Sequence, residues 1–262
     1  MTVVLKLGGS VVTEKDVPET VDEEALGRAA DAIAGALAGG TIDPGGLVVV
    51  HGGGSFGHHH ADRHGVTDTA GTRDAQALAD IHAAMGELNA AVVDALHERG
   101  VDALPVRPLS LAHHGATDAE TGRADESGSL HLPTGSVPVM LDEGFVPVLH
   151  GDVVVHEGRG GTILSGDEIV ASLARSLAAD RVGLCSTVPG VLDADGNVIR
   201  RVDALSDVAA LGDSDATDVT GGMAGKVRTL LALPAPAHVF GLADLPAFLA
   251  GDATGTVVGG DS

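Results

Sequence analysis

Short apolar runs alternate with longer amphipathic stretches along most of the chain. Continuous runs rich in valine and leucine predict buried strands at residues 3–7, 46–51, 103–106, 145–150 and 182–186. Between these runs, apolar residues recur three and four positions apart, which predicts helices at about 21–37, 73–99 and 166–178. Strands that alternate with helices are typical of a mostly parallel sheet covered on both faces, so the pattern predicts an α/β fold.

Two kinds of polar stretch interrupt this alternation. Residues 112–135 are rich in Gly, Asp, Thr, His and Ser without a period, which predicts a loop or flap between two halves of the chain. Residues 193–197 are predicted to form a hairpin turn, and residues 213–222 are turn-rich. We find no internal repeat, so a single domain over residues 1–262 is expected.

Acidic residues outnumber basic ones by a wide margin. The chain holds 37 Asp and Glu against 15 Lys and Arg, which gives a formal net charge of −22. Such a surface repels nucleic acid and anionic membranes, which excludes both as partners. The acids are spread along the chain rather than gathered in a tail, as expected for the solvated surface of a folded protein.

We hypothesise that this acidic surface is an adaptation to high salt, where counter-ions screen the repulsion between carboxylates. We expect the melting temperature to be maintained or raised as KCl increases to molar concentration. A melting temperature that falls steadily over that range, measured by circular dichroism, would contradict the hypothesis.

The apolar content of 44% supports a sizeable core, built from Ala, Val and Leu rather than from aromatic residues. No uninterrupted apolar run reaches 18 residues, so no membrane span is predicted, and the N-terminus has no cleavable signal pattern. The single cysteine, Cys185, excludes an internal disulfide and is typical of a reducing cytoplasm. We therefore expect a cytoplasmic protein.

Lysine is nearly absent from the chain. Only Lys6, Lys15 and Lys226 occur, and the other 12 of the 15 basic residues are arginine. Each lysine lies beside a glycine-rich or turn-like segment. Where general surface lysine is so rare, the three that remain are expected to have a specific task.

Two glycine turns follow predicted strands. In residues 6–10, KLGGS, the glycines permit close approach of a ligand, and their N–H groups can form an anion site; an ordinary turn is the alternative. Residues 51–58, HGGGSFGH, formally satisfy G-x-G-x-x-G, the pattern of a dinucleotide site. Two observations count against a dinucleotide site. A complete strand with its own glycine turn already precedes this motif, and no acidic residue stands at the end of a clear second strand about 20 residues later.

Two further segments bear candidate chemistry. In residues 218–226, DVTGGMAGK, a glycine pair precedes Lys226 and can place its ammonium group over phosphates, although the segment is not a P-loop. A helix start with an exposed lysine is the alternative. Asp167 opens a predicted helix, where it either caps the helix or holds lysines in position. Asp152, after a strand and a glycine, is a similar and weaker candidate.

The histidine tract at residues 58–60, with His64 nearby, resembles a metal-binding sequence. A zinc site needs three or four ligands at defined spacing, and we assign no metal site. Solvent-facing side chains are predicted for His59, His60, His64, His113 and His114. His58 differs, because it follows the glycine turn and is expected to face a bound anion.

Taken together, the ordered segments KLGGS, HGGGSFGH, HGDVV, LSGDE and DVTGGMAGK resemble the amino acid kinase family, and within it the branch whose phosphate acceptor is isopentenyl phosphate. The resemblance covers nearly the whole chain. It implies an open three-layer α/β/α sandwich with an acceptor lobe at about residues 1–150 and an ATP lobe at about 151–262. It also implies ATP carried with Mg²⁺, an isoprenoid monophosphate as substrate, and a homodimer.

The resemblance further implies roles for individual residues. Catalytic roles are expected for Lys6, Lys15, His58, Asp167 and Lys226, with Asp167 organising the lysines. The acceptor is expected to contact Gly53, Gly54, Ser55, His58, Asp152, Ser165 and Gly166. The nucleotide is expected to contact Lys6, Gly8, Gly9, Ser10, Gly54, Thr187, Gly222 and Lys226.

One segment departs from the family pattern. Residues 186–190 read STVPG where many relatives have TDVDG, so two acids are missing and the contacts to adenine and ribose stay open. A fosfomycin-type kinase, or another small phosphate or phosphonate kinase of this fold, is an alternative that shares the glycine turn and the histidine. A dinucleotide-binding oxidoreductase and a histidine-rich metal-binding protein are alternatives of other classes.

Overall fold

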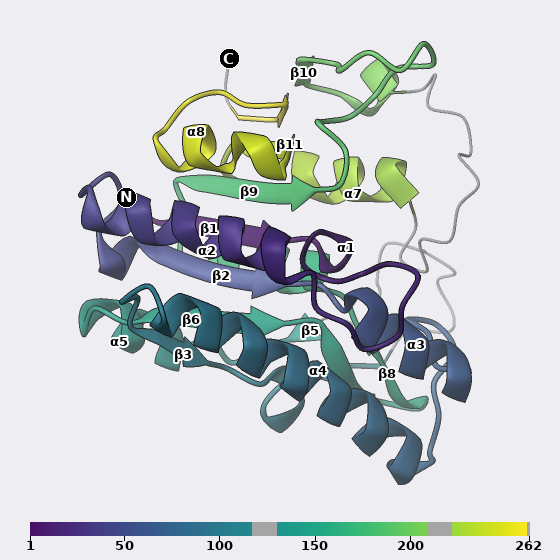
Figure 1. The fold of residues 1–262 in the computed structure, drawn as a ribbon. Coiled ribbons are helices and arrows are strands. Elements are labelled where there is room, and N and C mark those ends of the chain that lie inside the picture. The colour runs from purple at the N-terminus through teal and green to yellow at the C-terminus, as the bar shows by residue number, and fades with distance from the viewer. Residues whose placement is uncertain (117–129, 209–221, 261–262) are drawn as a thin grey trace.

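Parallel strands form the centre of the molecule. The computed structural model describes residues 1–116, 130–208 and 222–260. Its main sheet has the strand order β10-β12-β11-β9-β1-β2-β6-β3, and every neighbouring pair is parallel except β11 and β12 (Figure 1). The strands are β1 Val3–Leu7, β2 Leu47–His51, β3 Ala103–Pro105, β6 Val146–His150, β9 Arg181–Ser186, β10 Arg201–Val202, β11 Ala237–Gly241 and β12 Thr256–Val258.

A smaller sheet of four strands lies beside the main one, in the order β5-β4-β7-β8. These strands are β4 His113–His114, β5 Leu130–His131, β7 Asp152–His156 and β8 Gly160–Leu164. The described helices are α1 Gly9–Val12, α2 Glu23–Ala38, α3 Gly54–His64, α4 Ala75–His97, α5 Ser136–Asp142, α6 Gly166–Ser176, α7 Gly222–Leu231 and α8 Leu245–Leu249. The chain passes from the main sheet to the smaller one at Gly151, between β6 and β7.

Helices cover both faces of the main sheet, as the alternation of strands and helices predicts. Alternate residues of a strand point to opposite faces, and Val3, Leu5 and Leu7 pack with α2, α4 and α8 in one core. Val4 packs with α6 in the other core. Because Lys6 has the same parity as Val4, it lies on the α6 face, at the end of the strand. This alternation brings Lys6 to the start of α6.

The predicted strands and helices are found within a few residues of their expected bounds, and the turn at residues 193–197 is confirmed by a bridge between Leu192 and Val198. The elements that were not predicted include α3 and the hairpin of β7 and β8, which contribute to the site described below. The ends of the expected loop at 112–135 form β4 and β5, while residues 117–129 and most of 213–222 lie outside the described residues. None of the described helices is long and apolar enough to cross a bilayer.

Candidate active site

The carboxyl ends of β1, β2, β6 and β9 meet at one edge of the main sheet, because neighbouring parallel strands run in the same direction. A cavity of about 690 Å³ lies at this edge. Ligands bind at this position in open α/β sheets. The predicted site residues that line it are Lys6, Gly8, Gly9, Ser10, Lys15, Gly53, Gly54, Ser55, His58, Asp152, Ser165, Gly166, Asp167, Thr187 and Lys226. Gly222 begins α7, the helix that carries Lys226.

The two glycine turns pack against each other, backbone on backbone. A methyl group on Gly9 would overlap the backbone nitrogen of Gly54, and one on Gly52 would lie 2.7 Å from the nitrogen of Gly9. Gly54 also has φ of +50°, in the left-handed region that favours glycine. These glycines are therefore required by the contact between the turns as well as by the approach of a ligand.

Lys6 is held by a carboxylate at the start of α6. Its Nζ lies 2.6 Å from Oδ1 of Asp167, and the two side chains are 12% and 15% exposed. The helix is capped by Ser165 and Glu168 in a reciprocal capping box, which leaves Asp167 free to bind the lysine rather than the backbone. The Lys6 Cε would lie 3.1 Å from a methyl group on Gly166, so glycine at this position leaves room for the lysine.

The other cationic groups converge on the same cavity from separate elements. Lys15 lies on the loop after α1, His58 on α3 and Lys226 on α7, and all three line the cavity with Lys6. The chain's whole complement of lysine therefore surrounds one cavity. The His58 ring lies beside Gly53, is solvent-exposed and makes no hydrogen bond to a described residue. It is free to donate one to a bound anion.

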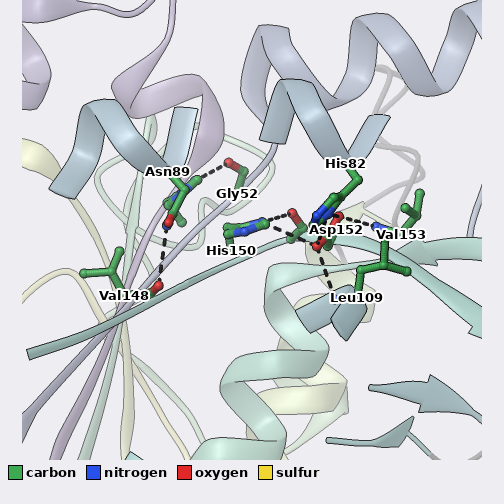
Figure 2. Close-up of polar contacts among 10 residues, drawn as sticks. Gly52, His82, Asn89, Leu109, Val148, His150, Asp152 and Val153 are labelled. Atoms are coloured by element: carbon green, nitrogen blue, oxygen red, sulfur yellow. Dashed lines mark hydrogen bonds and ion pairs between the residues drawn. The ribbon is translucent and has the colours of Figure 1, made fainter. Parts of the chain in front are cut away.

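Asp152 lines the cavity but directs its carboxylate into the protein. The side chain is fully buried and accepts hydrogen bonds from His82 Nδ1 at 2.9 Å and from the backbone N–H groups of Val153 at 2.9 Å and Leu109 at 3.3 Å. Figure 2 shows these donors surrounding the carboxylate. Because protein donors occupy the carboxylate, its expected contact with a substrate stays a prediction.

His51 and His150 are the last residues of the neighbouring strands β2 and β6, each just before a glycine, and neither was identified from the sequence. Their rings are buried and stacked, with centroids 5.5 Å apart. Each ring places Nδ1 near the carbonyl oxygen of the glycine that follows it, at 3.1 Å for Gly52 and 2.9 Å for Gly151 (Figure 2). Burial lowers the pKa of His51 to about 3 and also lowers that of His150, so both rings are neutral and can donate Nδ1–H. The repeated His-Gly pair after a buried strand was the available signal.

The buried histidines predict that acid weakens the fold. Burial lowers the pKa of His51 from 6.5 to about 3, so between these values the unfolded chain binds a proton that the folded chain does not. The free energy of unfolding should therefore fall as pH falls below about 6.5, by about 1.4 kcal/mol per pH unit from His51. Urea unfolding of the wild type and His51→Gln between pH 7.5 and 5 measures this. Equal slopes for the two proteins would contradict it.

The prediction of solvent-facing histidines is wrong for His114 and holds only in part for His60 and His64. His114 is 4% exposed rather than solvent-facing, because β4 pairs with β7 and places the ring between Thr162 and Glu168. His59 and His113 are exposed as predicted, whereas His60 and His64 are partly buried and pair with acids. Across the described ranges, no group of three or more His, Cys, Asp or Glu side chains is arranged to hold a metal ion.

Comparison with known proteins places this geometry in a family. The model of the amino acid kinase family matches residues 1–234. The chain is 62% identical over 260 residues to the isopentenyl phosphate kinase of Haloferax volcanii, covering 99% of each chain. It is 34% identical to the enzyme of that name from Methanothermobacter thermautotrophicus, over 88% of this chain and 86% of that one.

The fold agrees with this assignment. A solved structure of isopentenyl phosphate kinase superposes with a TM-score of 0.81 at 26% identity, covering 98% of this chain and 100% of that one. The two structures share the three-layer α/β/α arrangement that the sequence motifs imply. The chain therefore belongs to the amino acid kinase family and is a kinase.

Proposed function

We propose that this protein is an isopentenyl phosphate kinase, which transfers the γ-phosphoryl group of ATP to isopentenyl phosphate. The observation that carries the proposal is the convergence of the chain's three lysines and His58 on one cavity at the strand ends. A protein with net charge −22 has gathered its scarce lysine where two phosphorylated substrates would meet. The 62% identity to the Haloferax enzyme supports the acceptor.

The chemistry requires little beyond positive charge and positioning. The acceptor phosphate is already an anionic nucleophile near neutral pH, since its second pKa lies near 6, so no general base is needed. One of its oxygens forms the new bond to the γ-phosphorus as the bond to the ADP oxygen breaks, and the electron pair leaves with ADP. Charge spreads over the transferring group, where lysines and backbone N–H groups stabilise it.

Each cationic group has a place in this scheme. Lys6, oriented by Asp167, faces the transferring phosphoryl group, and Lys226 faces the nucleotide from α7. His58 donates a hydrogen bond to the acceptor phosphate beside Gly53. The neutral rings of His51 and His150 hold the carbonyls of Gly52 and Gly151, at the ends of β2 and β6. Mg²⁺ would enter with the nucleotide, bound to its phosphate oxygens.

The acceptor is tested by ADP release with Mg-ATP in molar KCl, comparing isopentenyl phosphate, dimethylallyl phosphate, fosfomycin and no acceptor. Turnover with the isoprenoid phosphates and formation of a diphosphate, measured by mass spectrometry, is expected. Turnover with fosfomycin alone would keep the mechanism and replace the acceptor. No turnover with any acceptor would overturn the proposal.

Assembly and location complete the proposal. We expect a homodimer, as the family resemblance implies. We expect it to lie in the cytoplasm, as the single, buried cysteine supports. Burial raises the pKa of the Cys185 thiol to about 12, which keeps it out of nucleophilic and disulfide chemistry. Light scattering coupled to gel filtration in molar KCl measures the mass, and a monomeric mass would contradict the dimer.

A further inference from the structure

Residues 13–21, named here the Lys15 hairpin, form one wall of the cavity. An antiparallel bridge joins Thr13 to Val21, and the N–H of Glu14 donates to the carbonyl of Thr20 at 2.9 Å. The loop between them places Lys15, Asp16 and Pro18 on the cavity. In Figure 1 this loop follows α1 and lies beside α3, the helix that carries His58.

Lys15 lacks the direct support that Lys6 has. The Lys6 ammonium is fixed by the carboxylate of Asp167 at 2.6 Å, whereas the exposed Lys15 side chain forms no ion pair or hydrogen bond with a described residue. A lysine side chain has a flexible stem of four carbons, and it samples many rotamers unless a partner fixes its ammonium group. The position of the Lys15 ammonium therefore depends on where the backbone of the hairpin is held.

The hairpin contacts α3 at two places, one at its base and one beyond Lys15. At its base, the N–H of Ser55 donates to Thr13 Oγ1 at 3.0 Å, while the contacts of Ser55 with Thr20 and Glu19 are long, at 3.4 Å. Beyond Lys15, Glu19 Oε1 lies 2.7 Å from His60 Nε2. Among the described contacts between the loop and the helix this one is the shortest, and it joins residues 41 positions apart in sequence.

His60 is a firm point of attachment. Its side chain is 13% exposed and lies between two other rings of α3, with centroids 5.3 Å from His59 and 6.5 Å from His64. His64 in turn contacts Asp80 of α4 at 3.1 Å. The attachment point therefore belongs to a packed helix pair, whereas Glu19 belongs to the loop. A contact between a fixed ring and a loop carboxylate restrains the loop.

Glu19 has an unusual backbone. Its φ is +51°, a left-handed conformation that residues other than glycine adopt rarely and at some cost. Such a conformation persists only where surrounding contacts enforce it, and these outliers gather at functional sites. Here the conformation turns the Glu19 side chain toward α3 at the end of the loop that carries Lys15.

We propose that the Glu19–His60 contact is a latch that holds the Lys15 hairpin against α3 and thereby positions the Lys15 ammonium over the cavity. Glu19 and His60 are positioning residues that act through Lys15 and do not touch the substrates. The inference rests on the proposed function, because it assigns Lys15 a part in phosphoryl transfer. The proposal gives two residues of the histidine tract separate roles: His58 binds the acceptor phosphate, and His60 holds the loop that carries Lys15.

The test is a double-mutant cycle between Glu19 and Lys15. We expect Glu19→Ala to lower kcat by about tenfold or more with a smaller change in KM for ATP, because misplacement of a charged group by about 1 Å can cost up to about 10²-fold. In a Lys15→Ala background, adding Glu19→Ala should change kcat by less than about twofold, since the lysine that it positions is gone. An equal loss in both backgrounds would overturn the latch.

Two variants control for charge and chemistry. Glu14→Ala removes an acid from the same hairpin without removing a side-chain contact, and its kcat should match the wild type. Glu19→Gln keeps an oxygen that accepts the His60 N–H, so it should recover most of the activity that Glu19→Ala loses. The proposal would also be refuted if Glu19→Ala kept the wild-type kcat. It would equally be refuted if Glu14→Ala lowered kcat as much as Glu19→Ala does.

Hydrogen exchange tests the latch without any turnover. Peptides that cover residues 14–20 should exchange faster in Glu19→Ala than in Glu14→Ala, at an unchanged melting temperature, because only the first variant frees the loop. Unchanged exchange in Glu19→Ala would overturn the latch. If the wild type shows no turnover with isopentenyl phosphate, the proposed function fails while this measurement still decides whether the loop is held.

Discussion

Gly9→Ala is expected to abolish phosphoryl transfer and to lower the free energy of unfolding by about 3 kcal/mol or more. The added methyl group would overlap the backbone of Gly54, and no flexible side chain is present there to move aside. The two glycine turns would have to separate, which would displace the N–H groups that face the cavity. Urea unfolding and ADP release, both in molar KCl, measure the two effects.

The matched control is Gly35→Ala in α2. This glycine is exposed, and a methyl group on it would meet nothing within 4 Å. Because alanine favours a helix interior over glycine by about 1 kcal/mol, the variant should be slightly more stable and fully active. Normal activity in Gly9→Ala would show that the contact between the turns is dispensable for catalysis.

His58→Ala is expected to lower kcat by roughly 10²–10³ while the melting temperature stays at the wild-type value. The loss follows from removing a hydrogen-bond donor aimed at the acceptor phosphate. Stability is unaffected because the ring is exposed and makes no hydrogen bond to a described residue. Steady-state kinetics with isopentenyl phosphate and a thermal melt check the two parts.

Two companions to this variant test its chemistry. His58→Gln retains an N–H donor and should recover part of the activity, whereas an acid–base role would not be rescued by an amide. His113→Ala removes an exposed histidine of the smaller sheet that does not line the cavity, and should be fully active. Near-normal turnover in His58→Ala would remove this residue from the mechanism.

Local patterns predict the parts of this protein that local physics fixes. The alternation of β1 places Lys6 on the α6 face, and glycines at strand ends place both turns at one edge of the sheet. Helix α3 escaped prediction because its sequence, GSFGHHHADRH, contains two glycines and little apolar periodicity. It is stabilised by tertiary packing, in which Phe56 joins Met85 and Leu88 of α4 in a separate small core.

Contacts between distant residues account for what the sequence could not predict. Whether Asp167 caps α6 or holds a lysine could not be decided until the partners of Ser165 and Asp167 were known. The burial of His114 depends on the pairing of β4 with β7, and the stacking of His51 on His150 depends on two strands becoming neighbours. The contact of Glu19 with His60 joins a loop to a helix that was itself not predicted.

The placement of every lysine around one cavity has a consequence for handling the protein. Reagents that acylate primary amines normally decorate a protein's outer surface at many points. In this chain their only targets besides the N-terminus are the groups that surround the cavity. Fluorophores, cross-linkers or solid supports attached through amines would therefore modify the site itself. Immobilisation is better directed to an added tag or to the carboxylates, which are spread over the rest of the surface.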